Sequence, residues 1–202
     1  MLHLIIKLAL IIAVICLVPI TLICAQSYDD SELRAFLTPP EGCPAPCFMG
    51  IRPGVTTAEE AIAILNNSDW IRGNPQLNTQ LSTHWPWSNQ RSPWIDAQVD
   101  GALQVVDDKV DYLTIRTQLR VGDIMALLGQ PDDKQFIPWA ILYGPGSAYQ
   151  YSAWYGETGL EIVTTSARCP INHRLFQSKT VIRVRSTPPK WQPDLGRPPC
   201  PT

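Results

Sequence analysis

The sequence is poor in charged residues and in histidine. Of its 202 residues, 17% are charged and three are histidine, whereas typical soluble domains have about 25% charged residues. The formal net charge is −2, so the chain lacks the basic excess that marks nucleic-acid-binding domains. We therefore expect no nucleic-acid partner.

Sequence motifs of common catalytic sites are also missing. A nucleophile needs a base, usually histidine, and only His84 and His173 lie outside the apolar N-terminus. No Gly-x-Ser-x-Gly sequence occurs, and the glycine-rich stretch 143–146 lacks the lysine and the helix of a phosphate-binding loop. The acidic pairs at 59–60 and 107–108 are expected to be solvated, in a helix first turn and a hairpin turn. We therefore expect no catalytic residues, no metal and no cofactor.

Charge is absent from Leu8 to Ala25. An apolar run of this length lies between the core of a secretory signal and a membrane-spanning helix. Residues 1–25 are thus predicted to be a signal peptide or a membrane anchor. Lys7 precedes the run and acidic residues follow it, which predicts that the rest of the chain is exported. The expected location is extracytoplasmic, either secreted or anchored by an N-terminal transmembrane helix with the C-terminal part outside.

Four cysteines lie beyond this segment, at Cys43, Cys47, Cys169 and Cys200. An even number of cysteines in an exported domain is typical of disulfides. Three pairings of the four are possible. We favour Cys43–Cys47 together with Cys169–Cys200, because the second bond would hold the C-terminal tail to the body of the domain.

Two other uses of Cys43 and Cys47 stay open. A reactive dithiol usually lies at a helix N-terminus, where the dipole lowers a thiol pKa, but the two intervening prolines prevent a helix through this pair. A zinc site of three cysteines and one histidine would add Cys169 and His173, whose spacing fits loosely. An oxidising compartment favours disulfides over both alternatives.

Composition and hydrophobic periodicity divide the chain into five parts. These are the apolar segment 1–25, a linker with a short helix and the cysteine loop at 26–50, a first α+β repeat at 51–117, a second α+β repeat at 118–186, and a proline-rich tail at 187–202. Each repeat is expected to be a short helix followed by antiparallel strands. The predicted fold class is therefore a layered α+β fold with two repeats.

Local signals place three helices and several strands. Helices are expected at 31–37, at 56–65 with Thr56 as N-cap and Glu59 completing a capping box, and at 121–128 before Gly129. In the expected hairpin, Val110, Tyr112 and Thr114 are predicted to share one face. Strands are expected at 82–87, 94–99, 103–106, 110–115, 140–143, 149–155, 160–165 and 181–184.

The two predicted repeats begin with similar residues. Ile51-Arg-Pro-Gly54 corresponds to Leu119-Arg-Val-Gly122, and an apolar helical run follows each. The first repeat has Gly-x-Thr-x-x-Glu before its helix, and the second has Leu-Gly-x-Pro after its helix. These patterns resemble the motif of the small lipoproteins of the outer-membrane β-barrel assembly machine, a fold that β-lactamase inhibitor proteins contain in tandem. The resemblance implies a layered α+β fold that binds protein partners and performs no chemistry.

A tryptophan-rich stretch at 84–94 is the candidate binding surface. Trp85, Trp87 and Trp94, with Arg91 between them, have the aromatic and hydrogen-bonding groups of a peptide- or sugar-binding platform. The alternative is a strand pair whose alternate tryptophans are buried, since Trp85 and Trp87 point to the same face.

The sequence therefore predicts a non-catalytic binding or assembly module at the cell envelope, with a protein or glycan partner. The alternative is an envelope thiol-redox or zinc-binding protein that uses Cys43 and Cys47.

Overall fold

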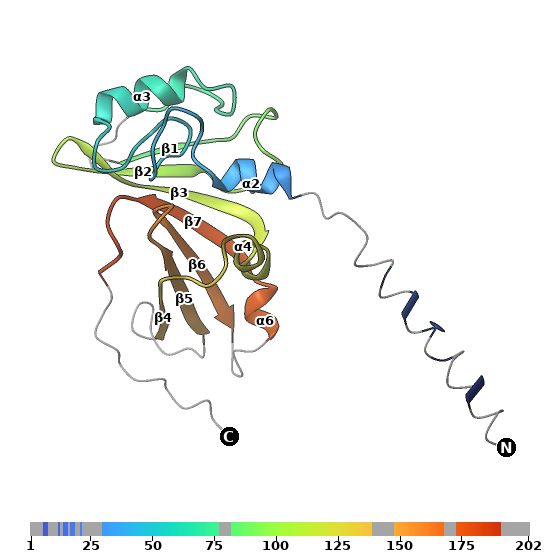
Figure 1. Cartoon of the computed structure of the whole chain (residues 1–202). Helices are drawn as coiled ribbons and strands as arrows, with labels where there is room; N and C mark the ends of the chain where they lie inside the picture. The colour runs from blue at the N-terminus through green and yellow to red at the C-terminus, as the bar shows by residue number, and fades with distance from the viewer. Residues whose placement is uncertain are drawn as a thin grey trace. The chain divides into compact units, whose positions relative to one another are not determined.

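The computed structural model describes residues 6, 7, 12, 14, 15, 17, 18, 21, 30–76, 82–138, 148–167 and 173–190 (Figure 1). The chain divides into two compact units, Met1–Glu32 and Leu33–Thr202. The second unit has an α+β fold built on a seven-stranded antiparallel sheet, as its alternation of helical and strand patterns predicts.

The expected N-terminal anchor is not supported. A transmembrane helix needs about 20 consecutive, mainly apolar residues. Among the residues that the structure describes, no helix is both long and apolar enough to do so. The predicted localisation, with a transmembrane helix at the N-terminus, is therefore wrong.

The helices in the described ranges are short. They are α2 (Ser31–Leu37), α3 (Ala58–Asn66), α4 (Val121–Leu128) and α6 (His173–Phe176). The bounds of α2 and α4 confirm the prediction. His173, the histidine of the alternative zinc site, is the first residue of α6. Helices α4 and α6 lie side by side (Figure 1).

Helix α3 begins one residue later than its sequence motif suggests. Thr57, not Thr56, is the N-cap: its side chain accepts a hydrogen bond from Glu60 N, and its own backbone N–H donates to Glu60 Oε2 at 2.9 Å. Thr56 Oγ1 instead accepts from the backbone N–H of Arg52 at 2.8 Å. Thr56 also bonds with its backbone to Arg52 and Val110. These contacts hold it outside the helix, so the capping box shifts by one residue.

Replacing Thr57 by alanine is expected to lower the free energy of unfolding by about 1 kcal/mol. The hydrogen bonds from Thr57 also lower the pKa of Glu60 below its usual 4.5. A lowered folded-state pKa stabilises the fold above the unfolded-state pKa, and this stabilisation is lost as pH falls through the folded-state value. The backbone N–H of Thr57 lowers this pKa most and is kept in T57A, so urea unfolding at neutral pH and at acid pH should show the difference between wild type and T57A shrinking only slightly in acid. Glu59→Gln is the control, because Glu59 is exposed on the same turn.

The strands form one sheet in the order β1-β2-β3-β7-β6-β5-β4. Their bounds are β1 (Ser82–Trp85), β2 (Gly101–Val106), β3 (Lys109–Arg120), β4 (Asp133–Pro138), β5 (Ala148–Tyr155), β6 (Leu160–Ala167) and β7 (Lys179–Arg185). The expected strand 94–99 is wrong, since only Ile95 forms a bridge there, with Thr117. Strand β4 was not predicted, and the strand expected at 140–143 lies outside the described residues.

One face of the sheet carries the core. Its side chains include Leu113 and Ile115 of β3, Ile182 of β7 and Ile162 of β6, each no more than 2% exposed. Buried residues of α2, α3, α4 and α6 belong to the same hydrophobic cluster. These helices therefore cover the core face.

The opposite face, which we call the polar face, holds none of the members of that cluster. It is defined by the alternate residues of the paired strands: Tyr112, Thr114, Arg116 and Gln118 of β3, Lys179, Val181, Arg183 and Arg185 of β7, Glu161 and Val163 of β6, and Ser152 and Trp154 of β5. On β5 and β6 these side chains are buried, whereas along β3 and β7 they are half-buried or exposed.

A β-bulge decides which residues of β3 lie on each face. Gln104 pairs with Tyr112, but the next residue, Val105, pairs with Val110. Asp111 is therefore an extra residue on β3, and the alternation reverses there. Val110 points into the core with Leu113, so the prediction that Val110 and Tyr112 share a face is wrong.

Candidate functional site

The predicted tryptophan platform is not assembled at the surface. The side chains of Trp85 and Trp87 are 0% and 4% exposed, and their rings pack edge to face with centroids 5.7 Å apart. Both rings cover Gly101, where a Cβ atom would overlap with them. Trp85 and Trp87 therefore belong to the core, which is the alternative that their spacing allowed.

The other two predicted surface residues are half-buried. Trp94 packs against the edge of the core, and Arg91 Nη1 donates to the carbonyl of Ser88 at 3.0 Å. A binding role for Trp94 and Arg91 stays a prediction.

Cys43 and Cys47 form the expected disulfide, with Cα atoms 6.0 Å apart. Cys169 and Cys200, the second predicted pair, lie outside the described residues. Within the described residues, no group of three or more potential ligands could hold a metal ion. A pocket of about 350 Å³ lies beside the disulfide. Its walls are formed by Ala35, Phe36, Thr38, Pro40, Cys47, Phe48, Met49, Ser68 and Trp70.

Replacing both Cys43 and Cys47 by serine is expected to lower the free energy of unfolding by about 2 kcal/mol. The bond closes a loop of five residues, and the loop-entropy relation gives this value for so short a loop. Guanidinium unfolding of wild type and variant measures it. If complete reduction of the bond by a strong reductant has the same effect as the double substitution, the loss comes from the bond and not from the serines.

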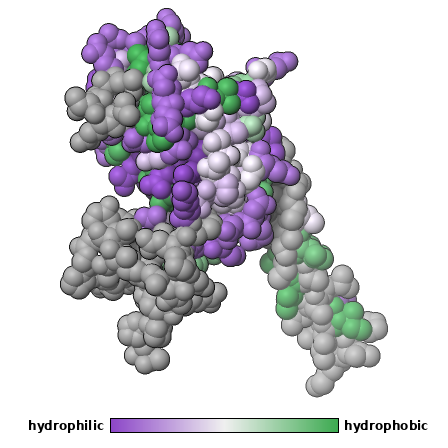
Figure 2. Space-filling view, turned by 90° about the vertical axis from the view of Figure 1, so that its left-hand side faces the viewer, coloured by the Kyte–Doolittle hydropathy of each residue, from purple (hydrophilic) through white to green (hydrophobic). Residues whose placement is uncertain are grey.

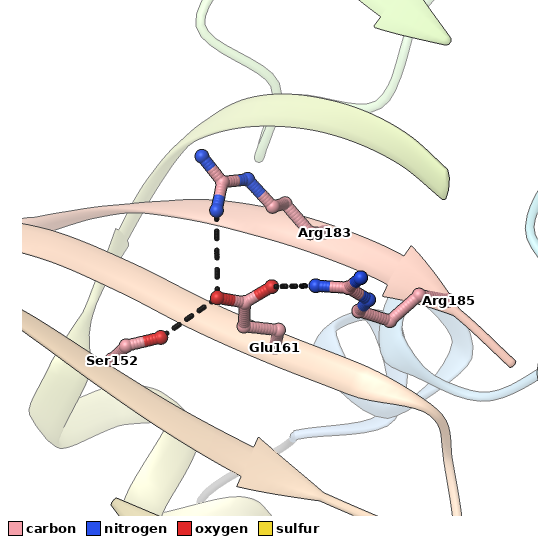
Figure 3. A network of polar contacts seen from close by, with 4 residues as sticks. All are labelled: Ser152, Glu161, Arg183 and Arg185. Atoms are coloured by element: carbon pink, nitrogen blue, oxygen red, sulfur yellow. Dashed lines mark hydrogen bonds and ion pairs between the residues drawn. The ribbon is translucent and has the colours of Figure 1, made fainter. Parts of the chain in front are cut away.

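A buried network lies on the polar face (Figure 3). The side chain of Glu161 is 3% exposed and receives three donors. Ser152 Oγ donates to Oε1 at 2.8 Å, Arg183 Nη1 lies 3.4 Å from Oε1, and Arg185 Nη1 lies 3.1 Å from Oε2. The strand register produces this arrangement: Glu161 pairs with Arg183, while Arg185 and Ser152 are its diagonal neighbours.

Tyr112 supports the two arginines from the next strand. It pairs directly with Arg185, and its ring centroid lies 5.6 Å from Cζ of Arg185 and 5.9 Å from Cζ of Arg183. Each contact is a cation–π interaction. The ring and the carboxylate together hold both guanidinium groups in place.

The polar face is basic along its two central strands. We call one row of cations on this face the basic stripe. It consists of Arg116 of β3 and of Lys179, Arg183 and Arg185 of β7. Arg116 and Lys179 are exposed, and the Lys179 ammonium contacts the side-chain oxygen of Gln118. Glu161 is the carboxylate that contacts the stripe, so the stripe with this partner carries three positive charges on a chain of net charge −2. Asp133 of β4, which pairs with Trp154, is a further carboxylate on the same face.

Two tyrosines with shifted pKa values lie on the core face and not on the polar face. Burial raises the pKa of Tyr151. Burial, followed by the charges of Tyr151 and Asp132, raises the pKa of Tyr155 to about 12. Tyr155 Oη donates to the carbonyl of Gly129 at 3.3 Å, which ties β5 to the end of α4. Both phenols are therefore neutral near pH 7 and have structural surroundings.

The network residues were missed in the sequence, although a signal was present. In the segment Lys179-Thr-Val-Ile-Arg-Val-Arg185, buried positions alternate with outward positions, of which all but Val181 are basic, and such alternation is typical of a strand with one solvated face. No family model, curated protein or solved structure matches the chain.

Proposed function

We propose that the chain is a non-catalytic binding or assembly module that contacts its partner through the polar face. The observation that carries the proposal is the basic stripe, a row of accessible cations on a sheet face to which the described helices contribute no core residue. Charged groups arranged in this way steer and orient a partner of complementary charge. A protein partner fits best, and a glycan is the other class that the tryptophan-rich sequence suggested.

The contacts of Glu161 favour binding over chemistry. A general acid or base needs a free oxygen within reach of the substrate. Both oxygens of Glu161 already receive donors from Ser152, Arg183 and Arg185. The carboxylate therefore acts as a buried counter-ion that positions the arginines.

We also propose that the sheet consists of two repeats. Strands β1–β3 follow α3, and strands β4–β6 follow α4. Each set forms a three-stranded antiparallel array, and the two arrays flank β7. The N3 residues of α3 and α4, Glu60 and Asp123, both bond back to the N-cap backbone. Similar helix starts before similar arrays support a duplication.

Capture experiments with matched charge-reversal variants test the proposed function. The stripe variant is Arg116→Glu with Lys179→Glu, and the control is Arg72→Glu with Lys134→Glu, which reverses two exposed cations off the polar face. Wild type and control are expected to capture the same protein or glycan from a native extract, and the stripe variant is expected to lose it. Equal capture by all three would contradict a role for the polar face.

The thiol-redox or zinc-binding alternative keeps one supporting observation. Cys47 lies in the wall of the pocket beside the disulfide, so a small substrate there would meet its sulfur. A labile Cys43–Cys47 bond under mild reductant, with fast thiol labelling or zinc uptake afterwards, would favour this alternative. A bond that resists mild reductant would favour the binding module.

A further inference from the structure

The charge of the polar face points to the kind of partner. This inference rests on the proposed binding function and adds the chemistry of the partner. The surface seen in Figure 2 is largely hydrophilic. Among the described residues of the second unit, the exposed large hydrophobic side chains are Val55, Val106 and Phe176. Val106, at the hairpin end of β2, lies by strand alternation on the same side of the sheet as Tyr112, and none of the three is on β7. Recognition there must therefore use charge and hydrogen bonds more than apolar burial.

The arginines of the stripe have donors to spare. A guanidinium group has five N–H donors, and the contacts to Glu161 use one nitrogen of each arginine. Nε of Arg183 and Nε of Arg185 are buried, so a partner would meet the remaining Nη donors of these side chains, which are 34% and 16% exposed. The ideal complement to such a group is a carboxylate, which accepts two parallel N–H bonds from one arginine.

The spacing of the stripe suggests how several carboxylates would be presented. On β7, Arg183 follows Lys179 by four positions and Arg185 follows Arg183 by two. Arg116 of β3 is the diagonal neighbour of Arg183. Alternate residues of a strand are about 6.6 Å apart. An extended segment laid along the face has the same repeat, so acidic side chains at alternate positions would meet successive cations.

Pre-organisation makes this surface suited to binding. Tyr112 and Glu161 already fix Arg183 and Arg185, so fewer rotamers are lost when a partner binds. We propose that the basic stripe binds an extended acidic segment of a partner protein that carries Asp or Glu at alternate positions.

Fluorescence anisotropy with synthetic peptides tests this proposal on the full chain. The probe is a labelled octapeptide of alternating Glu and Ala, and the matched control has Gln in place of Glu. At low salt the Glu peptide is expected to bind at least about tenfold more tightly than the Gln peptide, because several exposed charge pairs each contribute modestly. Raising the salt from about 0.05 M to about 0.5 M should remove most of this difference.

Two stripe variants separate binding from folding. Arg183→Gln with Arg185→Gln is expected to weaken the Glu peptide about tenfold, but it also disturbs the Glu161 network. Arg116→Gln with Lys179→Gln leaves that network intact and is expected to weaken binding severalfold. The control Arg72→Gln with Lys134→Gln should bind as wild type does.

Three results would overturn the proposal: equal affinity for the Glu and Gln peptides, unchanged affinity in the R116Q/K179Q variant, or displacement of the peptide by an equal concentration of inorganic phosphate or of single-stranded RNA. If extract capture depends on the stripe while the Glu peptide fails to bind, the acidic segment is wrong and the binding function stands. If capture is also independent of the stripe, both are wrong.

Discussion

Replacing Trp85 by alanine is expected to lower the free energy of unfolding by about 3–5 kcal/mol, the usual cost of deleting a fully buried tryptophan side chain. Its ring is 0% exposed and packs on Trp87 and on the backbone of Gly101. The neighbouring strand β2 has no side chain at Gly101 to fill the space, so a cavity would remain. Guanidinium unfolding followed by circular dichroism measures the loss.

His84→Ala is the matched control for W85A. His84 is the preceding residue of the same strand, and its side chain is exposed. The control is expected to change the free energy of unfolding by less than about 0.5 kcal/mol. A W85A protein that is as stable as wild type, but unable to capture a partner, would contradict the core position of Trp85 and favour the predicted binding surface.

Replacing Glu161 by alanine is expected to lower the free energy of unfolding by about 2–3 kcal/mol. Removing one member of a buried ion pair typically costs about 3–5 kcal/mol. The value is smaller here because Arg183 and Arg185 are 34% and 16% exposed and water can reach them. Ser152, which is 0% exposed, would also lose its acceptor.

Glu157→Ala provides the comparison, since this carboxylate is exposed in the β5–β6 turn. It should leave stability within about 0.5 kcal/mol of wild type. Urea unfolding of both variants in low and high salt adds a second criterion. A buried pair is screened little by salt, so the cost of E161A should persist at high salt. A cost that vanishes there would show that the network is solvated.

The parts of the fold that could be predicted are those that local sequence decides. Helix α4 has an acidic residue in its first turn and Gly129 at its end, and Gly129 has a positive φ of 80°, a conformation that glycine adopts without steric cost. The hairpin turn at Asp107 and Asp108 was also expected, and both residues have positive φ. Capping and turn preferences act within a few residues, so they are readable in the sequence.

Strand pairing was beyond prediction because it depends on distant residues. Strand β7 lies between β3 and β6, and this position is encoded by which apolar faces fit together. The bulge at Asp111 likewise shows no local signal, yet it reverses which side chains of β3 are buried. The predicted position of the capping box is wrong by one residue for the same reason. The contacts of Thr56 with Arg52 and Val110 determine which threonine is the N-cap.

The candidate site could not be predicted either, because it also depends on strand pairing. The alternation of basic residues on β7 is visible in the sequence, but only the pairing with β6 and β3 brings Glu161 and Tyr112 to Arg185. The tryptophan-rich stretch is chemically more conspicuous than the stripe. It is largely core because Gly101 leaves room for two indole rings against the sheet.

Site-specific photo-crosslinking in native cells tests the central claim most directly. A benzoylphenylalanine residue is placed either at Gln118, exposed on the polar face, or at Ala63, exposed on helix α3. If the polar face is the binding surface, irradiation produces a discrete adduct from position 118 and none from position 63. An adduct from position 63, with none from position 118, would contradict the proposed function.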